Sequence, residues 1–284
     1  MHRLTRAGTA LLLVSLAATP ARAADVDGAK VAAALGRPVP QQAAGGVYRL
    51  GLPRSDLKVV VDGVLIKPAF ALGGWVAFMP AGDGAMVMGD LVLTQSEINP
   101  VMKRLIEGGF EISAIHNHLL RAEPSPIYMH IGGHGDAVAL ASTIHDAMAL
   151  SALPAAAPPS APPPQVELDT AALDTVMGAK GAANGGVYQF NVARAAPGSA
   201  HVINFQPTEN GKAAITGDFV LLAGEVNPVL RTLRAHGIEV TVLHSHMLRD
   251  DPRLFFMHFW ANADAVTLAR GVRAALDVTQ GRRG

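Results

Sequence analysis

Residues 85–120 read AMVMGDLVLTQSEINPVMKRLIEGGFEISAIHNHLL, and residues 213–248 read AAITGDFVLLAGEVNPVLRTLRAHGIEVTVLHSHML. The first stretch has an apolar run, an amphipathic segment closed by Gly108-Gly109, and an alternating run, which is the pattern of strand, helix and strand. The correspondence extends to residues 148 and 276 at a constant offset, and 25 of these 64 aligned positions are identical. This identity indicates that the chain contains one module twice.

A proline-rich segment separates the two copies. Residues 151–165, SALPAAAPPSAPPPQ, have a composition that favours extended polyproline geometry and therefore a semi-rigid linker. We expect a first module at 24–150 and a second at 166–284. The motif Gly-Gly-Val-Tyr at 45–48 returns at 185–188 with a longer offset, so the second copy lacks a counterpart to part of residues 59–74.

Periodicity predicts the elements of each module. In the first module we expect a helix at 29–35 ended by Gly36, a strand at 57–66 with a turn at Asp62-Gly63, a strand at 85–93, a helix at 96–107, strands at 110–120 and 127–131 joined by a turn at 121–125, and a helix at 136–150; the helix at 171–177 repeats the first one. The central β-α-β-β-α order favours the α+β class. We expect two tandem ferredoxin-like (split β-α-β) modules with extra N-terminal strands, related by internal duplication.

The N-terminus has the pattern of a cleavable secretion signal. Arg3 and Arg6 precede an apolar stretch at 10–18, and Ala21-Arg22-Ala23 matches a cleavage site, so we expect a signal peptide at 1–23. Removing it takes three arginines from a chain with 23 basic and 23 acidic residues and leaves a net charge of −3. That balance argues against a nucleic-acid partner.

Two absences narrow the function classes further. The chain has no cysteine, which excludes disulfides, thiolate metal ligands, a catalytic thiol and a lipid-bearing cysteine. No apolar run reaches the length of about 18 residues that suggests a membrane-spanning helix. Together with the signal, this predicts a periplasmic or secreted protein without a membrane span.

Histidines recur in a fixed pattern in both copies. His116 and His118 precede His130 in the first copy, and His244 and His246 precede His258 at the same spacing in the second. On a strand, positions i and i+2 point to one face, which here would be the buried face of Phe110 and Ile112. A hairpin would bring the third histidine beside the first two. Three imidazoles suit a divalent transition metal such as zinc, copper, nickel or iron.

Carboxylates near these histidines are further candidates. Glu123 and Asp251 each lie five residues after the second histidine, where either would complete a metal shell or carry a proton. Asp90 and Asp218 each follow a glycine in a predicted strand and are weighed as a fourth ligand or a partner of one, against a role in a turn or a helix cap. Arg121 and Arg249 are interpreted as surface charges paired with the neighbouring acidic residue, with the binding of an anionic substrate as the alternative.

Three functions remain open at this level. The first is a metal-binding protein. The second is a metal-dependent hydrolase-like enzyme with an open coordination position. The third is a metal-free module for ligand binding or interaction, in which the histidines are hydrogen-bonded core groups. The sequence has no nucleotide-binding glycine motif, His-Glu-x-x-His or Gly-x-Ser-x-Gly, which argues against those enzyme classes.

The two repeated stretches, with YMHIGGHGD at 128–136 and PRLFFMHFWA at 252–261, resemble the LppY/LpqO family. Its members are domains of unknown function and often carry the domain twice. The resemblance implies a domain of unknown function present twice and brings no catalytic residue with it. Some members are lipoproteins, and this chain departs from them because it has no cysteine to acylate.

Overall fold

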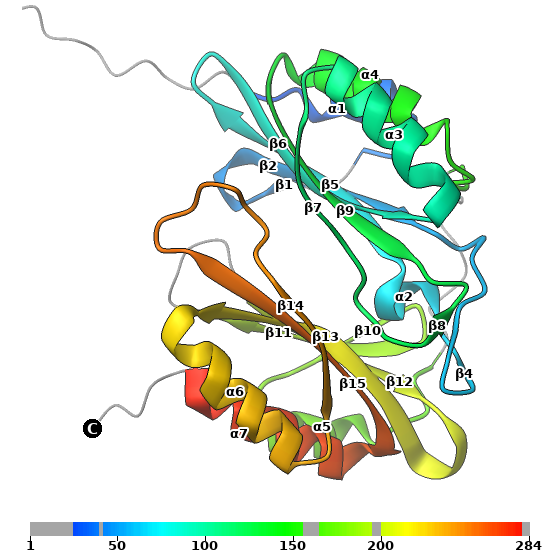
Figure 1. Cartoon of the computed structure of the whole chain (residues 1–284), viewed down its shortest axis with the longest axis vertical. Coiled ribbons are helices and arrows are strands. Elements are labelled where there is room, and N and C mark those ends of the chain that lie inside the picture. The colour runs from blue at the N-terminus through cyan, green and yellow to red at the C-terminus, as the bar shows by residue number, and fades with distance from the viewer. Residues whose placement is uncertain (1–24, 40–41, 156–164, 195–199, 280–284) are drawn as a thin grey trace, which may run out of the picture.

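The computed structural model describes residues 25–39, 42–155, 165–194 and 200–279. The predicted signal peptide at 1–23 and most of the predicted linker at 151–165 therefore lie outside the described residues. The chain forms two similar α+β halves, each an antiparallel sheet with helices on one face. Figure 1 shows the two sheets facing each other, with the helices on the outer sides.

The first half runs from α1 to α4. Its elements are α1 (Gly28–Leu35), β1 (Gln42–Ala43), η1 (Ala44–Gly46), β2 (Val47–Pro53), β3 (Val60–Val61), β4 (Val64–Leu65), α2 (Pro68–Ala71), β5 (Gly73–Ala81), β6 (Gly84–Leu93), α3 (Gln95–Glu107), β7 (Glu111–His116), β8 (Ala122–Glu123), β9 (Ile127–Gly135) and α4 (Ala137–Met148). The predicted helices are present, and Asp136 accepts a hydrogen bond from the Ala139 N–H as the N-cap of α4.

The second half repeats this order with fewer elements. They are α5 (Thr170–Met177), β10 (Ala182–Asn184), β11 (Val187–Ala193), β12 (Ala200–Pro207), η2 (Glu209–Gly211), β13 (Lys212–Leu222), α6 (Ala223–Ala235), β14 (Glu239–His244), β15 (Leu254–Asp264) and α7 (Ala265–Thr279). Gly36 and Gly178 end α1 and α5 in the left-handed conformation, which glycine adopts without strain.

Strand order is the same in the two large sheets. It is β1-β2-β5-β6-β9-β7 in the first and β10-β11-β12-β13-β15-β14 in the second. The third strand of each β-α-β-β unit, β9 or β15, pairs antiparallel with both others. The predicted β-α-β-β-α order is therefore present in both halves, and it places the histidine-bearing hairpin at one edge of each sheet.

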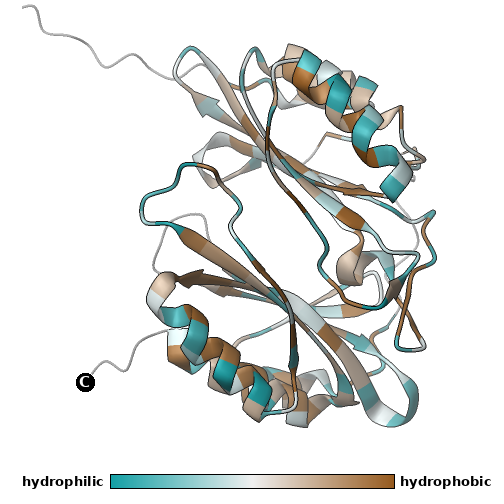
Figure 2. Cartoon of the chain, viewed as in Figure 1, coloured by the Kyte–Doolittle hydropathy of each residue, from teal (hydrophilic) through white to brown (hydrophobic). Residues whose placement is uncertain are grey.

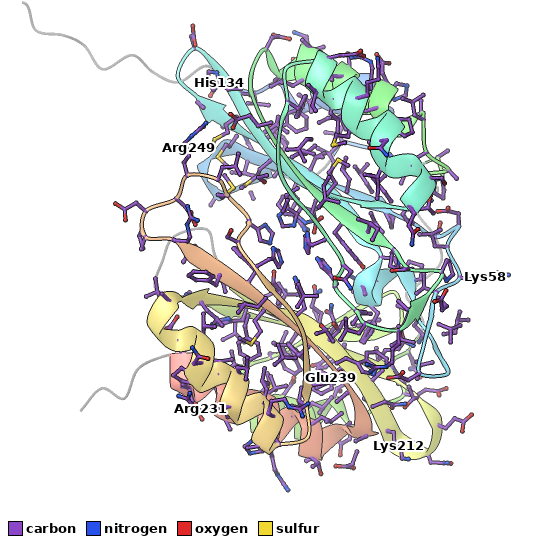
Figure 3. The ribbon with its side chains drawn as sticks, viewed as in Figure 1. Lys58, His134, Lys212, Arg231, Glu239 and Arg249 are labelled. Atoms are coloured by element: carbon purple, nitrogen blue, oxygen red, sulfur yellow. The ribbon has the colours of Figure 1, made fainter. Side chains whose placement is uncertain are left out.

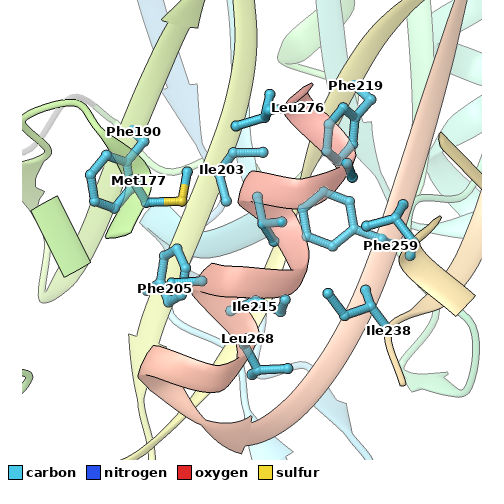
Figure 4. Packing of buried hydrophobic residues seen from close by; sticks show 14 of the residues in the cluster. Met177, Phe190, Ile203, Phe205, Ile215, Phe219, Ile238, Phe259, Leu268 and Leu276 are labelled. Carbon is cyan, nitrogen blue, oxygen red and sulfur yellow. The ribbon is translucent and has the colours of Figure 1, made fainter. Parts of the chain in front are cut away.

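Apolar side chains on the helix-facing side of each sheet form that half's core. In the second half, Met177 of α5, Phe205 of β12 and Leu276 of α7 pack in one buried cluster (Figure 4). Burying a side chain of this size stabilises the fold by about 1.5–3 kcal/mol relative to leaving it exposed. The outer helices carry both hydrophilic and hydrophobic residues (Figure 2), as expected for helices with one buried face. No helix of the described residues is long and apolar enough to cross a membrane.

A third apolar cluster joins the two halves. It combines Phe70 and Tyr128 of the first half with Val187 and Trp260 of the second. Much of it comes from residues 57–72, which we call the insert and which contain β3, β4 and α2. The insert overlaps residues 59–74, the region that lacks a full counterpart in the second copy.

Hydrogen bonds fasten the insert to the second half. The side-chain amides of Asn204 and Gln206 each donate to an insert carbonyl, of Phe70 and Leu65 respectively, at 2.8 Å. The Trp260 indole N–H donates to Asp62 at 2.9 Å. The extra residues of the first copy therefore serve the contact between the halves.

Two predicted strands differ in extent from the structure. The strand expected at 110–120 ends at His116, because the chain leaves the sheet edge and Ala122–Glu123 pair with Val60–Val61 of the insert. The strand expected at 57–66 is reduced to β3 and β4, joined by the predicted turn at Asp62-Gly63. Both differences arise from pairing between segments about 60 residues apart, which local periodicity does not reveal.

Candidate metal centre

A β-bulge in each edge strand orients the first two histidines. In β7, Ile112 pairs with Ile131 and Ala114 pairs with His130. Between these two pairs β7 therefore has one residue that has no partner in β9. The same irregularity separates Val240 from Val242 in β14. An extra residue reverses which face the following side chains occupy.

The bulge corrects the expected face of the histidines. Ile112 packs against the core beneath the helices, as predicted for a buried position. His116 pairs with Tyr128 after the bulge and lies on the opposite side of the sheet, which faces the other half. The histidines therefore do not continue the face of Phe110 and Ile112; they point into the space between the two sheets.

All six repeated histidines meet in that space. Their rings pair across the halves, with centroid separations of 3.9 Å for His116 and His244, 3.9 Å for His118 and His258, and 3.6 Å for His130 and His246. Under the duplication His118 corresponds to His246 and His130 to His258, so the last two pairs are equivalent contacts. The two expected trios therefore adjoin each other and form one cluster shared between the halves. We call these six residues the histidine cluster.

Ring nitrogens in the histidine cluster lie close enough to share an ion. His116 Nε2 is 3.1 Å from His118 Nε2, and His244 Nε2 is 3.0 Å from His258 Nε2. Two all-histidine groups have ligand atoms that all lie within 4.8 Å of one another: His116, His118, His244 and His258 form one, and His130, His244 and His246 form the other. Each group takes residues from both halves.

Burial favours the neutral form of His116, His118, His244, His246 and His258. It is the main cause that lowers the pKa of His116 to about 2, of His258 to about 3 and of His244 to about 4, and repulsion from neighbouring imidazoles acts in the same direction. The pKa values of His118 and His246 are also lowered far below the usual range, first by burial. Neutral imidazoles have the free lone pair that a metal ligand needs.

Two carboxyl groups border the histidine cluster, the buried Asp90 and the half-buried Asp218. Asp90 is 7% exposed, and its oxygens lie 3.6 Å from His130 Nε2 and 3.9 Å from His118 Nε2, so these three residues form a further group of potential ligands. Burial raises the pKa of Asp90. It raises the pKa of Asp218, the equivalent residue, to about 8, and the charge of Asp90 adds to that shift.

Adjoining these carboxyl groups is a cavity of about 190 Å³ between the halves. Its lining includes Arg49, Trp75, Asp90 and His118 from the first half and Asp218 and His258 from the second. A small molecule in this cavity would therefore contact both the carboxyl groups and the edge of the histidine cluster.

Several buried polar atoms of this region have no hydrogen-bond partner among the described residues. They are Asp90 Oδ1, His116 Nδ1, both ring nitrogens of His130, Asp218 Oδ1 and His246 Nε2. A buried polar atom without a partner costs about 1–3 kcal/mol, so a concentration of them in one place calls for an explanation such as an ion or a ligand.

The structure does not bring Glu123 or Asp251 into any of the ligand groups. Both side chains are exposed, and Glu123 pairs through its backbone with Val60 of the insert. The hairpin connection at 117–126 is longer than the expected five-residue turn and leads Glu123 away from the sheet. The carboxylate that lies beside the histidines is Asp90, which the sequence analysis weighed as a ligand after Glu123 and Asp251.

Each repeated arginine contacts a carboxylate of the other half rather than the acidic residue near it in the chain, and Arg121 also pairs with Asp62 of its own half. Arg121 forms two hydrogen bonds each with Asp62 and Glu239, and Arg249 contacts Glu111 at 3.4 Å. Figure 3 labels Arg249 and Glu239, two residues of the second half whose partners, Glu111 and Arg121, belong to the first half. Each histidine hairpin therefore reaches over the edge strand of the other half.

Sequence reasoning missed two aromatic residues of the site. Tyr128 stacks on His118 with ring centroids 3.4 Å apart, and Phe256 lies 3.6 Å from His246. A signal was present, because an aromatic residue stands two positions before the third histidine in both copies. On a strand that spacing places it on the same face as the histidine.

Comparisons with known proteins assign a family and no activity. A search of curated proteins finds no match. A solved structure described as a trimeric bacterial microcompartment shell protein PduB aligns over 84% of this chain and 89% of that chain, at 12% identity and a TM-score of 0.25, which is too low to support an argument. The model of the Domain of Unknown Function (DUF1259) matches residues 29–150 and 171–278, most of both halves. The chain belongs to this DUF1259 family.

Proposed function

We propose that the protein binds a divalent transition metal, such as zinc, copper, nickel or iron, in the histidine cluster between its two halves. One observation carries the proposal: six imidazoles from two hairpins converge there, in groups whose ligand atoms lie within 4.8 Å of one another. Imidazole nitrogen is a preferred ligand of these metals, and the absence of cysteine excludes thiolate ligands.

The surroundings of the cluster support metal binding over simple core packing. Buried histidines in a core normally find hydrogen-bond partners, whereas both ring nitrogens of His130 and one of His246 have none among the described residues. The ring orientation of His258 is fixed by a contact of its Nδ1 with the Gly217 carbonyl at 3.0 Å. A second nitrogen held by a backbone carbonyl is the usual support for a metal-bound imidazole.

Elemental analysis of the purified full chain tests the proposal. We expect a stoichiometric transition metal in the wild-type protein and its loss in the double variant His116→Ala plus His244→Ala, which removes the central ring pair. The matched control is His134→Ala plus His236→Ala, because both residues are exposed and belong to no ligand group. A wild-type protein that retains no metal after loading and dialysis would refute the proposal.

A metal-dependent hydrolase-like enzyme is the second candidate. It is favoured by the cavity of about 190 Å³ that adjoins His118 and His258 and contains Asp90 and Asp218. A carboxyl group with a pKa near neutrality, such as Asp218 at about 8, is suited to accept or donate a proton during hydrolysis. Hydrolysis of chromogenic esters that disappears in Asp218→Asn, while metal content is retained, would favour this candidate over a binding protein.

A metal-free module with structural histidines is the third candidate. It is favoured by the short His116–His118 and His244–His258 nitrogen contacts, which are hydrogen bonds if one ring of each pair carries the proton. In that case, replacing histidine by glutamine would destabilise the protein to the same extent with and without added metal.

We also propose the finer assignments that the sequence suggests. Each half is a ferredoxin-like module with extra N-terminal strands, supported by the position of β9 between β6 and β7 while α3 connects them. Membership of the LppY/LpqO family and a periplasmic or secreted location rest on the sequence. N-terminal sequencing of the protein recovered from a cell fraction tests the location and the expected cleavage after Ala23.

A further inference from the structure

The histidine cluster has more ligands than one ion uses. Zinc in proteins is almost always four-coordinate, and catalytic sites hold it with three protein ligands. Six imidazoles and two adjacent carboxyl groups exceed both numbers. Because the cluster arose by duplication, a simple explanation is that each copy brought one set of ligands for one ion.

The all-histidine ligand groups combine histidines of both halves instead of collecting the three histidines of one half. Among the described residues, no all-histidine ligand group is drawn from a single half. His116 and His118 group with His258, whereas His244 and His246 group with His130. These two sets use each histidine once, and the duplication converts one set into the other.

We infer that the histidine cluster holds two metal ions in two equivalent subsites that exchange a ligand between the halves. Subsite 1 is His116, His118 and His258, and subsite 2 is His130, His244 and His246. This inference rests on the proposed function and adds to it the number of ions and the identity of each ligand set. Each subsite has three imidazoles, which leaves a coordination position for a carboxyl group, a water or a substrate.

One nitrogen separation in subsite 1 fits two ligands of one ion, and a similar separation of 3.0 Å joins His244 of subsite 2 to His258 of subsite 1. A tetrahedral ion with metal–nitrogen bonds of about 2.0–2.1 Å holds its ligand nitrogens about 3.3 Å apart. In subsite 1, His116 Nε2 and His118 Nε2 are 3.1 Å apart. A small separation of the rings would bring this pair to the expected distance.

Unpaired buried atoms point to the second subsite. If a single ion used only His116, His118, His244 and His258, both ring nitrogens of His130 and Nε2 of His246 would remain buried without a partner. These two rings are in contact, at 3.6 Å between centroids, and neither belongs to that four-histidine group. An ion in subsite 2 gives a partner to His246 and to one nitrogen of His130.

His244 belongs to both all-histidine groups, so the assignment of its nitrogen determines how many histidines each subsite has. Its Nδ1 contacts the Ser245 carbonyl at 3.2 Å, which leaves Nε2 as the nitrogen available to a metal. One nitrogen binds one ion in this setting, so His244 serves subsite 2 when both ions are bound. Subsite 1 then keeps three histidines, as the equivalence of the two halves requires.

Two double variants that remove the same number of histidines test the grouping. His118→Ala plus His130→Ala removes two histidines of the first half and, under the exchanged arrangement, one ligand from each subsite. His118→Ala plus His258→Ala removes two ligands of subsite 1 and leaves subsite 2 complete. The wild-type chain and both variants are loaded with zinc or cobalt(II), dialysed and analysed for metal per chain, with circular dichroism to confirm that each is folded.

We expect the wild-type protein to retain two ions, the variant lacking His118 and His258 to retain one, and the variant lacking His118 and His130 to retain none. Two ions in the wild type with the reverse order for the variants would show that each half holds its own ion and would overturn the exchange. One ion in the wild type would overturn the two-ion inference and leave the proposed function standing. No metal at all would refute both.

If an alanine variant does not fold, the same positions are changed to glutamine, which keeps the side chain's bulk and polarity without an imidazole. The wild-type titration with cobalt(II) also stands by itself. Absorption from tetrahedral cobalt that saturates at two equivalents supports the inference, and saturation at one equivalent contradicts it.

Discussion

The two halves of this protein share a framework and differ in what covers it. The first half has the insert, whose apolar side chains and hydrogen bonds attach it to β12, β13 and β15 of the second half. The second half has no such segment, and Met247 and Leu248 in its hairpin connection are 38% and 50% exposed. In the first half the residue equivalent to Met247, Leu119, is 3% exposed and packs with the insert.

This difference separates two kinds of residue. The framework elements and the six histidines have counterparts in both copies, whereas the insert serves the contact between them. Equivalent positions in the two halves are therefore a matched pair of sites, in which one substitution can be compared in two surroundings. Three such pairs test how far the halves are interchangeable.

The largest difference is expected at the arginine that follows β2 and β11. Arg54 is fully buried and donates hydrogen bonds to Glu97, Asp56 and the Val92 carbonyl. Burial opposes ionisation of Glu97, yet the hydrogen bonds from Arg54 and from backbone N–H groups outweigh it and lower the pKa of that carboxyl. Arg54→Ala would leave this carboxylate without its partner, so we expect a loss of about 3–5 kcal/mol in the free energy of unfolding.

Arg194→Ala is the matched change in the second half. Arg194 contacts Glu225 and the Val220 carbonyl, but its side chain is 11% exposed and water can replace part of what is lost. We expect a loss of about 1–3 kcal/mol. Urea unfolding of both variants measures the difference, with Arg231→Ala on the exposed side of α6 as the control (Figure 3). Equal losses would mean that burial does not distinguish the two arginines.

A smaller difference is expected at the glycines beside the two aspartates. A Cβ at Gly217 would lie 2.1 Å from the Val202 carbonyl oxygen, and one at Gly89 would lie 2.7 Å from the Trp75 carbonyl oxygen. Both contacts are with backbone atoms of the neighbouring strand, which side-chain rotation cannot relieve. We expect Gly89→Ala to cost about 1–3 kcal/mol and Gly217→Ala to cost more.

Thermal unfolding of these two glycine variants, followed by circular dichroism, gives the comparison. Gly224→Ala in the first turn of α6 is the control, since a Cβ there meets no atom within 4 Å. If the Gly217→Ala protein is as stable as the Gly89→Ala protein, β12 moves away from the added Cβ more easily than the 2.1 Å contact suggests.

The smallest difference is expected at the exposed arginines that link the halves. Arg121 forms paired hydrogen bonds with Asp62 of the insert and with Glu239, whereas Arg249 has one 3.4 Å contact with Glu111. We expect Arg121→Ala to lower the melting temperature slightly and Arg249→Ala to leave it unchanged, because exposed ion pairs contribute little and a single long contact least. Melting in low and high salt checks this: the Arg121 effect should shrink in high salt, and an effect that does not shrink is not electrostatic.

The sequence by itself determined the duplication, the helices and the hairpins, and it identified the six histidines. These features are local: a helix or a strand leaves its period in a dozen residues, and glycine, proline and aspartate mark the ends. The N-cap at Asp136 and the turn at Asp62-Gly63 were predictable for the same reason. Because the module is duplicated, a motif such as the three histidines can be recognised by its recurrence within one chain.

Only the tertiary structure decided which histidines meet. The bulges at Ser113 and Thr241 turn them to the face opposite Ile112, and a single inserted residue changes the face without changing the composition of the strand. The exchange of His130 and His258 between halves, and the departure of Glu123 toward Val60, depend on how two sheets and the insert pack. Contacts between segments far apart in the sequence leave no period in the chain, so the site is formed by the docking of the halves.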